Sequence, residues 1–149
     1  MENRRHPART TTSEAAAVTF VTDTHPLVFF ASGNLRQLSR EADRIFRRAH
    51  EGRDHIHVPA ICFFELALLL EAGRVRSTLP FEEWHALVAS QAGFTIEALA
   101  FEDVREARAL RALVDPFDRL IAAVAVRLDY PLITNDGRIG DSGLVRAVW

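Results

Sequence analysis

The apolar residues of this chain fall into short runs that predict strands and longer, periodic runs that predict helices. The strand-like runs are rich in β-branched or aromatic residues and cover residues 18–22, 55–58, 94–99, 132–134 and 144–148. The helical runs cover residues 24–32, 40–52, 61–72, 80–91, 101–113 and 116–129. Asp115 before Pro116 has the pattern of a helix N-cap followed by proline at the first helical position. Strands and helices therefore alternate along the chain.

This alternation predicts the α/β class, in which right-handed strand–helix–strand units build a mostly parallel sheet covered by helices on both faces. No internal repeat is visible, so residues 18–149 are expected to form one domain. Residues 1–17 lack the apolar segment of a secretory signal, and we interpret them as a poorly ordered tail or an extended start. Ligands of such sheets bind outside the carboxyl ends of the strands, which directs attention to the residues that follow each strand.

The composition favours a soluble domain with a proper core. The chain has 149 residues, 48% of them apolar, which is enough for one hydrophobic core. Its single cysteine, Cys62, cannot form an internal disulfide, and no apolar run approaches the roughly 20 residues that span a bilayer. We therefore expect a soluble, cytoplasmic protein without a membrane segment. The net charge of −2 gives no overall attraction for nucleic acid, so polyanion binding would need a local patch or a bound cation.

Carboxylates follow several of the predicted strands. Asp23 ends the first strand and Asp136 follows the fourth, while Asp115 and Asp118 lie at the start of a helix. Glu65 is the most unusual acid, because every other residue from 61 to 70 is apolar and burial of an unpaired carboxylate is costly. Four separate elements therefore bring acids to one plausible edge of the sheet.

Taken singly, three of these acids have ordinary structural explanations. Asp115 can cap its helix, and Asp118 can compensate the helix dipole or pair with Arg119. Asp136 precedes a glycine, as in a common turn. Together, however, several converging carboxylates repel one another strongly at close range, and a divalent cation with oxygen ligands, Mg²⁺ or Mn²⁺, would relieve that repulsion. The sequence therefore predicts that Glu65 faces a metal-binding acid cluster.

Other sites that handle phosphate lack their required residues. A receiver domain needs a lysine in its acid pocket, and all eighteen basic residues here are arginine. A phosphatase of the haloacid dehalogenase type needs Asp-x-Asp after its first strand, whereas Thr24 and His25 follow Asp23. The glycine-rich nucleotide-binding loops do not occur in the sequence. His55 and His57 alternate on a strand and could chelate a metal, although a half-buried strand face explains them better.

Four stretches of the chain resemble, in order and spacing, the motifs of PIN-domain ribonucleases, above all the VapC toxins of type II toxin–antitoxin systems. The stretches are VTDTHPLVFF, FFELALLLEAGRV, DPFDRLIAAVA and LITNDGRI, and the resemblance spans residues 18–149. It implies a three-layer α/β/α sandwich with a mostly parallel sheet and Mg²⁺-dependent endoribonuclease activity. A PIN-like module that binds RNA or acts as a scaffold without cleavage is the alternative, and the complete set of acids argues against it.

The same resemblance implies roles for individual residues. The metal ligands and catalytic acids would be Asp23, Glu65, Asp118 and Asp136. Supporting roles fall to Asp115, the additional acid of the DPFD stretch, and to Thr134, the hydroxyl residue before the fourth acid. The candidates for contact with RNA are Arg119, Arg138 and His25, and surface ion pairs explain the two arginines equally well.

The resemblance also implies partners, namely an RNA substrate, a cognate antitoxin whose C-terminal segment lies across the active site, and a second copy in a homodimer. The residues offer one place for an antitoxin helix. The helix at 24–32, with Leu27, Phe29 and Phe30, and the apolar stripe at 38–49 begin next to Asp23 and could form an exposed groove. The alternative is that these residues pack on the sheet.

Overall fold

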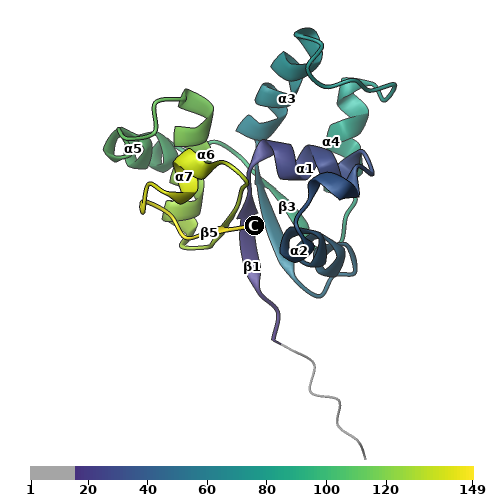
Figure 1. Ribbon diagram of the computed structural model, residues 1–149, viewed down its shortest axis with the longest axis horizontal. Coiled ribbons are helices and arrows are strands. Elements are labelled where there is room, and N and C mark those ends of the chain that lie inside the picture. Colours follow the sequence, from purple (N-terminus) through teal and green to yellow (C-terminus); the bar gives the residue numbers. More distant parts are fainter. Residues whose placement is uncertain (1–15) are drawn as a thin grey trace, which may run out of the picture.

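The computed structural model describes residues 16–149, which form a five-stranded sheet flanked by helices (Figure 1). The strands are β1 (Thr19–Thr22), β2 (His55–Pro59), β3 (Phe94–Glu97), β4 (Leu132–Ile133) and β5 (Ala147–Val148). They lie in the order β3-β2-β1-β4-β5, and every neighbouring pair is parallel. The predicted parallel α/β sheet is confirmed. Residues 1–15 of the expected tail lie outside the described range.

Six of the helices correspond to the six that the apolar periodicity predicts. These helices are α1 (Thr24–Ala31), α2 (Arg40–His50), α3 (Ile61–Glu71), α4 (Phe81–Ala89), α5 (Phe101–Ala109) and α6 (Pro116–Leu128). The sequence pattern did not predict the 3-10 turn η1 (Leu35–Gln37) or the short helix α7 (Gly137–Gly140). None of the helices in the described part of the chain has the length and apolar composition of a membrane-spanning segment.

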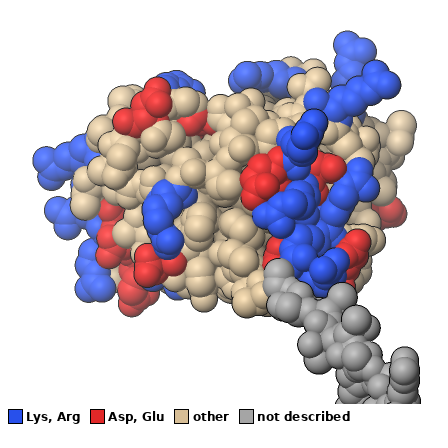
Figure 2. Space-filling model, turned by 60° about the horizontal axis from the view of Figure 1, so that its bottom comes forward, with Lys and Arg blue, Asp and Glu red and all other residues tan. Residues whose placement is uncertain are grey.

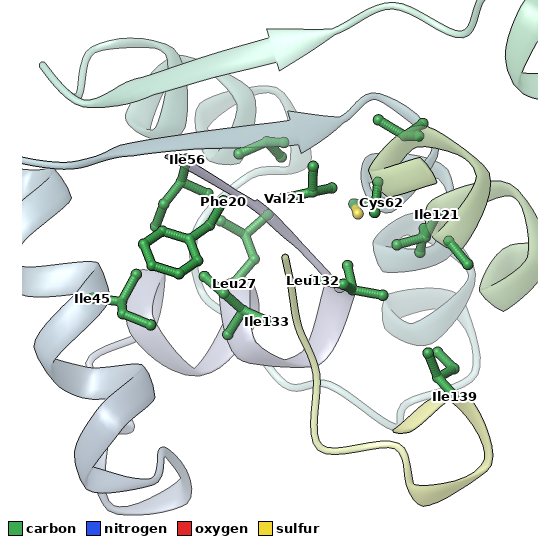
Figure 3. Packing of buried hydrophobic residues seen from close by; sticks show 14 of the residues in the cluster. Phe20, Val21, Leu27, Ile45, Ile56, Cys62, Ile121, Leu132, Ile133 and Ile139 are labelled. Carbon is green, nitrogen blue, oxygen red and sulfur yellow. The ribbon is translucent and has the colours of Figure 1, made fainter. Parts of the chain in front are cut away.

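The core lies on both faces of the sheet, as the three-layer arrangement requires. Successive side chains of a strand point to opposite faces. Phe20 of β1 points toward Leu27 of α1 and Ile45 of α2, whereas Val21 points to the side where Cys62 of α3 and Ile121 of α6 lie (Figure 3). Accordingly, α1 and α2 lie on one side of β1 and α5 and α6 on the other (Figure 1). The central strands are therefore covered on both faces.

The expected exposed groove along residues 38–49 is not present. The apolar stripe of α2, which includes Ile45 and Phe46, is fully buried against the sheet. The ring of Phe30 stacks on Phe46 with 4.9 Å between the ring centroids, so Phe30 also belongs to the packing of this layer. The prediction was wrong because one face of a central parallel sheet needs a whole apolar helix stripe to cover it.

Basic and acidic side chains are interleaved on the surface near the start of the described chain (Figure 2). Arginines of α2 and of the turn after it form ion pairs with nearby acids. The pairs are Arg44–Glu41, Arg47–Asp43, Arg48–Asp54 and Arg53–Glu51, with separations of 2.7–3.4 Å. This pairing places an acid beside each of these four arginines, in agreement with the small net charge of the chain.

Candidate active site

A pocket of about 470 Å³ lies at the carboxyl edge of the sheet, where all five acids singled out by the sequence meet. Asp23 follows β1, Glu65 lies on α3, Asp115 and Asp118 lie at the start of α6, and Asp136 follows β4. The other residues that line the pocket are His25, Pro26, Phe29, Leu69, Arg74, Asn135, Gly137 and Arg138. The convergence that the order of strands and helices predicted is therefore present.

Asp23 is held rigidly at the base of this arrangement. Its side chain is 5% exposed, and one carboxylate oxygen, Oδ1, accepts a hydrogen bond of 2.8 Å from the backbone N–H of Thr24 at the start of α1. The hydroxyl of Thr134 donates to the other oxygen, Oδ2, at 2.7 Å. The same hydroxyl accepts from the backbone N–H of Asp136 at 3.0 Å. Thr134 thus joins the acid after β1 to the acid after β4.

Asp115 performs the capping role that its position before proline predicts, and it also lines the pocket. Its Oδ1 accepts from the backbone N–H groups of Phe117 and Asp118 at 2.9 and 3.0 Å. Asp118 itself is half-buried and forms no ion pair within residues 16–149. The cap therefore fixes the first turn of α6, from which Asp118 reaches the pocket.

The two arginines predicted to contact RNA lie in different surroundings. Arg138 lines the pocket, and its guanidinium is paired with the carboxylate of Asp136 at 3.2 Å. Arg119 is not among the pocket residues, and its Nε donates to the backbone oxygen of Leu113 at 2.8 Å. His25 is exposed at the pocket, with its ring centroid 6.2 Å from that of Phe29. The structure therefore brings Arg138 and His25 to the acids but not Arg119.

Burial and mutual repulsion make these carboxylates difficult to ionise together. Burial raises the pKa of Asp23, and burial with the nearby charge of Asp23 raises the pKa of Glu65. For Asp118, burial followed by repulsion from Asp115 and Asp23 raises the pKa to about 7. Asp136 differs, because hydrogen bonds from Arg138 outweigh the opposing effect of its burial and lower its pKa. The pocket therefore carries uncompensated negative charge around Asp118.

Replacing Asp118 by asparagine is expected to stabilise the protein in the absence of divalent ions. The folded pKa of about 7 exceeds the ordinary value of 3.8, so ionised Asp118 lowers the free energy of unfolding above pH 7. This penalty disappears as the pH falls toward 3.8. After allowance for solvent screening of a half-exposed group, the gain at pH 8 should be on the order of 1 kcal/mol.

Urea unfolding in EDTA at pH 8 and at about pH 4 measures this effect, because near pH 4 the folded state keeps the proton of Asp118 and the penalty for ionising it is absent. Asp141→Asn, at an exposed aspartate that does not line the pocket, is the matched control and should change little at either pH. A lower free energy of unfolding for Asp118→Asn at pH 8 would show that the Asp118 carboxylate stabilises the fold.

The donor chemistry of the pocket fits a hard divalent cation. Its acids offer carboxylate oxygens, the ligands that Mg²⁺ and Mn²⁺ prefer. The buried hydroxyl of Thr24, next to Asp23, has no hydrogen-bond partner among residues 16–149. No three His, Cys, Asp or Glu side chains in the described part of the chain are already gathered as a ready metal-ligand set.

Sequence reasoning missed one charged residue of the pocket, Arg74. It lies in the turn between α3 and α4, directly after Gly73. The glycine indicated only that the helix ends there. Tertiary packing of this turn brings Arg74 to the pocket, so the local sequence carries no signal for its position.

Comparisons with known proteins agree with the fold and with the motifs. The PIN domain family matches residues 20–142. The chain is similar to Ribonuclease VapC22 of Mycobacterium tuberculosis, with 32% identity over 126 residues that cover 81% of this chain and 89% of that protein. The resemblance to the PIN-domain and VapC motifs is therefore confirmed across most of the chain.

Solved structures with lower sequence identity share the fold. The structure of VapBC2 from Rickettsia felis bound to a promoter DNA fragment gives a TM-score of 0.64 at 14% identity, covering 88% of this chain and 98% of that chain. A toxin–antitoxin complex from Klebsiella pneumoniae gives a TM-score of 0.57 at 20% identity, and the match covers 87% of this chain and 96% of that chain. With the matched family, the parallel sheet and the converging acids, the chain belongs to the PIN-domain family, within the group of VapC proteins.

Proposed function

We propose that this chain is the endoribonuclease toxin of a type II toxin–antitoxin module and hydrolyses RNA phosphodiester bonds with Mg²⁺, or Mn²⁺, held in its acid pocket. The observation that carries the proposal is the convergence of five carboxylates from four parts of the chain in one pocket of about 470 Å³. The name of the relative with 32% identity, a ribonuclease, supports the same activity. Buried and mutually repelling acids are costly, and a functional site is the usual reason for keeping them.

In this proposal the metal ligands and catalytic acids are Asp23, Glu65, Asp118 and Asp136. A cation bound there would supply Lewis acidity, which activates water for attack on phosphorus and stabilises charge on the leaving oxygen. Thr134 orients the carboxylate of Asp23 through its 2.7 Å hydrogen bond, and the capping side chain of Asp115 orients the first turn of α6.

The chain must also bind an anionic strand at an anionic pocket. Arg138 and His25 stand at the pocket and can contact an RNA phosphate, with Arg138 offsetting the charge of Asp136. Arg119 remains a weaker candidate, since its Nε is already bonded to the backbone of Leu113. The phosphate contacts hold the strand while the acids and the cation act on one bond.

The activity of such a toxin must be inhibited in the cell, and we propose that a cognate antitoxin binds this chain. We also propose that the chain forms a homodimer and acts in the cytoplasm. Similarity to proteins solved as VapBC and toxin–antitoxin assemblies supports the antitoxin as partner. Its binding site is not along the stripe of α2, because that stripe is covered by the sheet.

The ends of the RNA products test the proposed chemistry. Attack by activated water, with departure of the 3′ oxygen, leaves a 5′-phosphate and a 3′-hydroxyl. The purified full chain should therefore produce fragments that a 5′-phosphate-dependent exonuclease degrades. Fragments with a 2′,3′-cyclic phosphate would indicate attack by the RNA's own hydroxyl, and intact RNA bound to the protein would favour the non-cleaving module.

A further inference from the structure

Two arginines line the acid pocket, and they differ in what their side chains contact. Arg138 is bound to Asp136 through its guanidinium, and its backbone N–H donates to the same carboxylate at 2.9 Å. The side chain of Arg74 makes no hydrogen bond or ion pair with any residue in the range 16–149, although acids line the same pocket. Its charge is therefore available to an anion that enters the pocket.

The backbone of Arg74 is anchored, so its side chain extends from a defined point. Gly73 ends α3 in the left-handed conformation, with φ of 69°, and the N–H of Arg74 donates to the backbone oxygen of Leu69 at 2.9 Å. The next residue, Val75, packs on a small apolar cluster that contains Leu66 and Trp84. The turn is therefore held on both sides of Arg74.

Arg74 approaches the pocket from a different segment than the acids. Glu65 lies in the middle of α3, whereas Arg74 lies three residues after the last residue of that helix, Glu71. Arg74 lines the same pocket as the acids, but within residues 16–149 it makes no ion pair with any of them. Its guanidinium therefore stands beside the carboxylates without being bound by them.

We propose that Arg74 is a positioning residue that binds a phosphate of the RNA strand adjacent to the phosphate that is cleaved. This inference rests on the proposed function and specifies how the substrate is held there. An acidic pocket repels the phosphates that flank the reacting one, and a guanidinium in its wall offsets that repulsion with charge-assisted hydrogen bonds. Arg74 thus binds the strand, while the acids carry the reaction.

Binding of a labelled single-stranded RNA to full-length protein carrying Asp23→Asn tests the proposal without cleavage. In the presence of Mg²⁺, adding Arg74→Gln should weaken binding about fivefold to tenfold and reduce the slope of log affinity against log salt by about 0.7, the value for one phosphate contact on a single strand. Arg74→Lys should retain the slope because it retains the charge. Arg76→Gln, an exposed arginine two residues away that does not line the acid pocket, should change neither quantity.

Cleavage kinetics with Asp23 intact provide the second readout. Arg74→Gln should raise KM with little change in kcat, and its melting temperature should match that of the unsubstituted protein. Equal affinity and salt slope for Arg74→Gln and Arg76→Gln, with unchanged KM, would overturn the role of Arg74 and leave the proposed function standing. A folded, unsubstituted chain that neither cleaves nor binds RNA would overturn both.

Discussion

Replacing Asp23 by asparagine is expected to lower the rate of RNA cleavage on the order of a thousandfold while the domain stays folded. Asp23 is the most buried of the five acids that line the pocket, and its loss would remove a full negative charge from the proposed cation ligands. The fold should tolerate the change because asparagine caps helices as well as aspartate does. Its amide can also donate to the hydroxyl of Thr134, which now lies 2.7 Å from Oδ2.

Cleavage rates at saturating Mg²⁺, with thermal melting of the same samples, measure this prediction. Asp129→Asn is a suitable control, because Asp129 is exposed, lies outside the acid pocket, and has the left-handed φ of 58° that asparagine also adopts readily. A folded Asp23→Asn protein that cleaves RNA within tenfold of the unsubstituted rate would remove Asp23 from the catalytic set.

Gly93→Ala should destabilise the protein by about 3 kcal/mol or more, enough to prevent folding of a marginally stable domain. A Cβ at this position would collide with the backbone oxygen of Ala49 and would lie 2.5 Å from the backbone oxygen of Asp54. Neither backbone atom can move freely. Ala49 is in the buried stripe of α2, and Asp54 pairs with Arg48 at 2.7 Å. The end of α2 would therefore have to separate from the strand that Gly93 precedes.

Gly140→Ala is the matched control for this substitution. Its added Cβ would meet nothing closer than the Cβ of Ala147 at 3.9 Å, so stability should change by less than about 1 kcal/mol. Urea unfolding and the yield of soluble protein compare the two variants. A Gly93→Ala protein as stable as Gly140→Ala would show that the contact between α2 and β3 is looser than the structure indicates.

Much of this fold could be predicted because the spacing of buried residues along each helix and strand is a local property of the sequence. The apolar runs predicted six helices and a parallel sheet, and the positions after the strands indicated where the acids would meet. Strand order could not be read in the same way, since it depends on contacts distant in sequence. The backbone N–H of Asp23, for example, donates to the oxygen of Ile133 at 2.9 Å, and this pairing brings Thr134 to Asp23.

The errors also have physical reasons. The stripe containing Ile45 and Phe46 has the same pattern whether it covers a sheet or binds a partner helix, so periodicity could not choose between them. Arg74 lies within the FFELALLLEAGRV stretch, but nothing in that pattern marks it as a pocket residue, since its place at the pocket follows from the packing of the turn after α3. The close approach between backbones at Gly93 joins segments distant in sequence, so no local pattern indicates it.

In the proposed function, the carboxylates of this pocket cleave RNA with a divalent cation. The most direct measurement is the rate at which the purified protein cleaves one RNA under three conditions: in Mg²⁺, in EDTA, and after Mg²⁺ is restored in excess over EDTA. We predict cleavage in Mg²⁺, none in EDTA and recovery when Mg²⁺ is restored, with cleavage by Asp23→Asn slower on the order of a thousandfold in Mg²⁺. Equal cleavage in EDTA and in Mg²⁺ would contradict the proposal, as would intact RNA in all three conditions with folded protein.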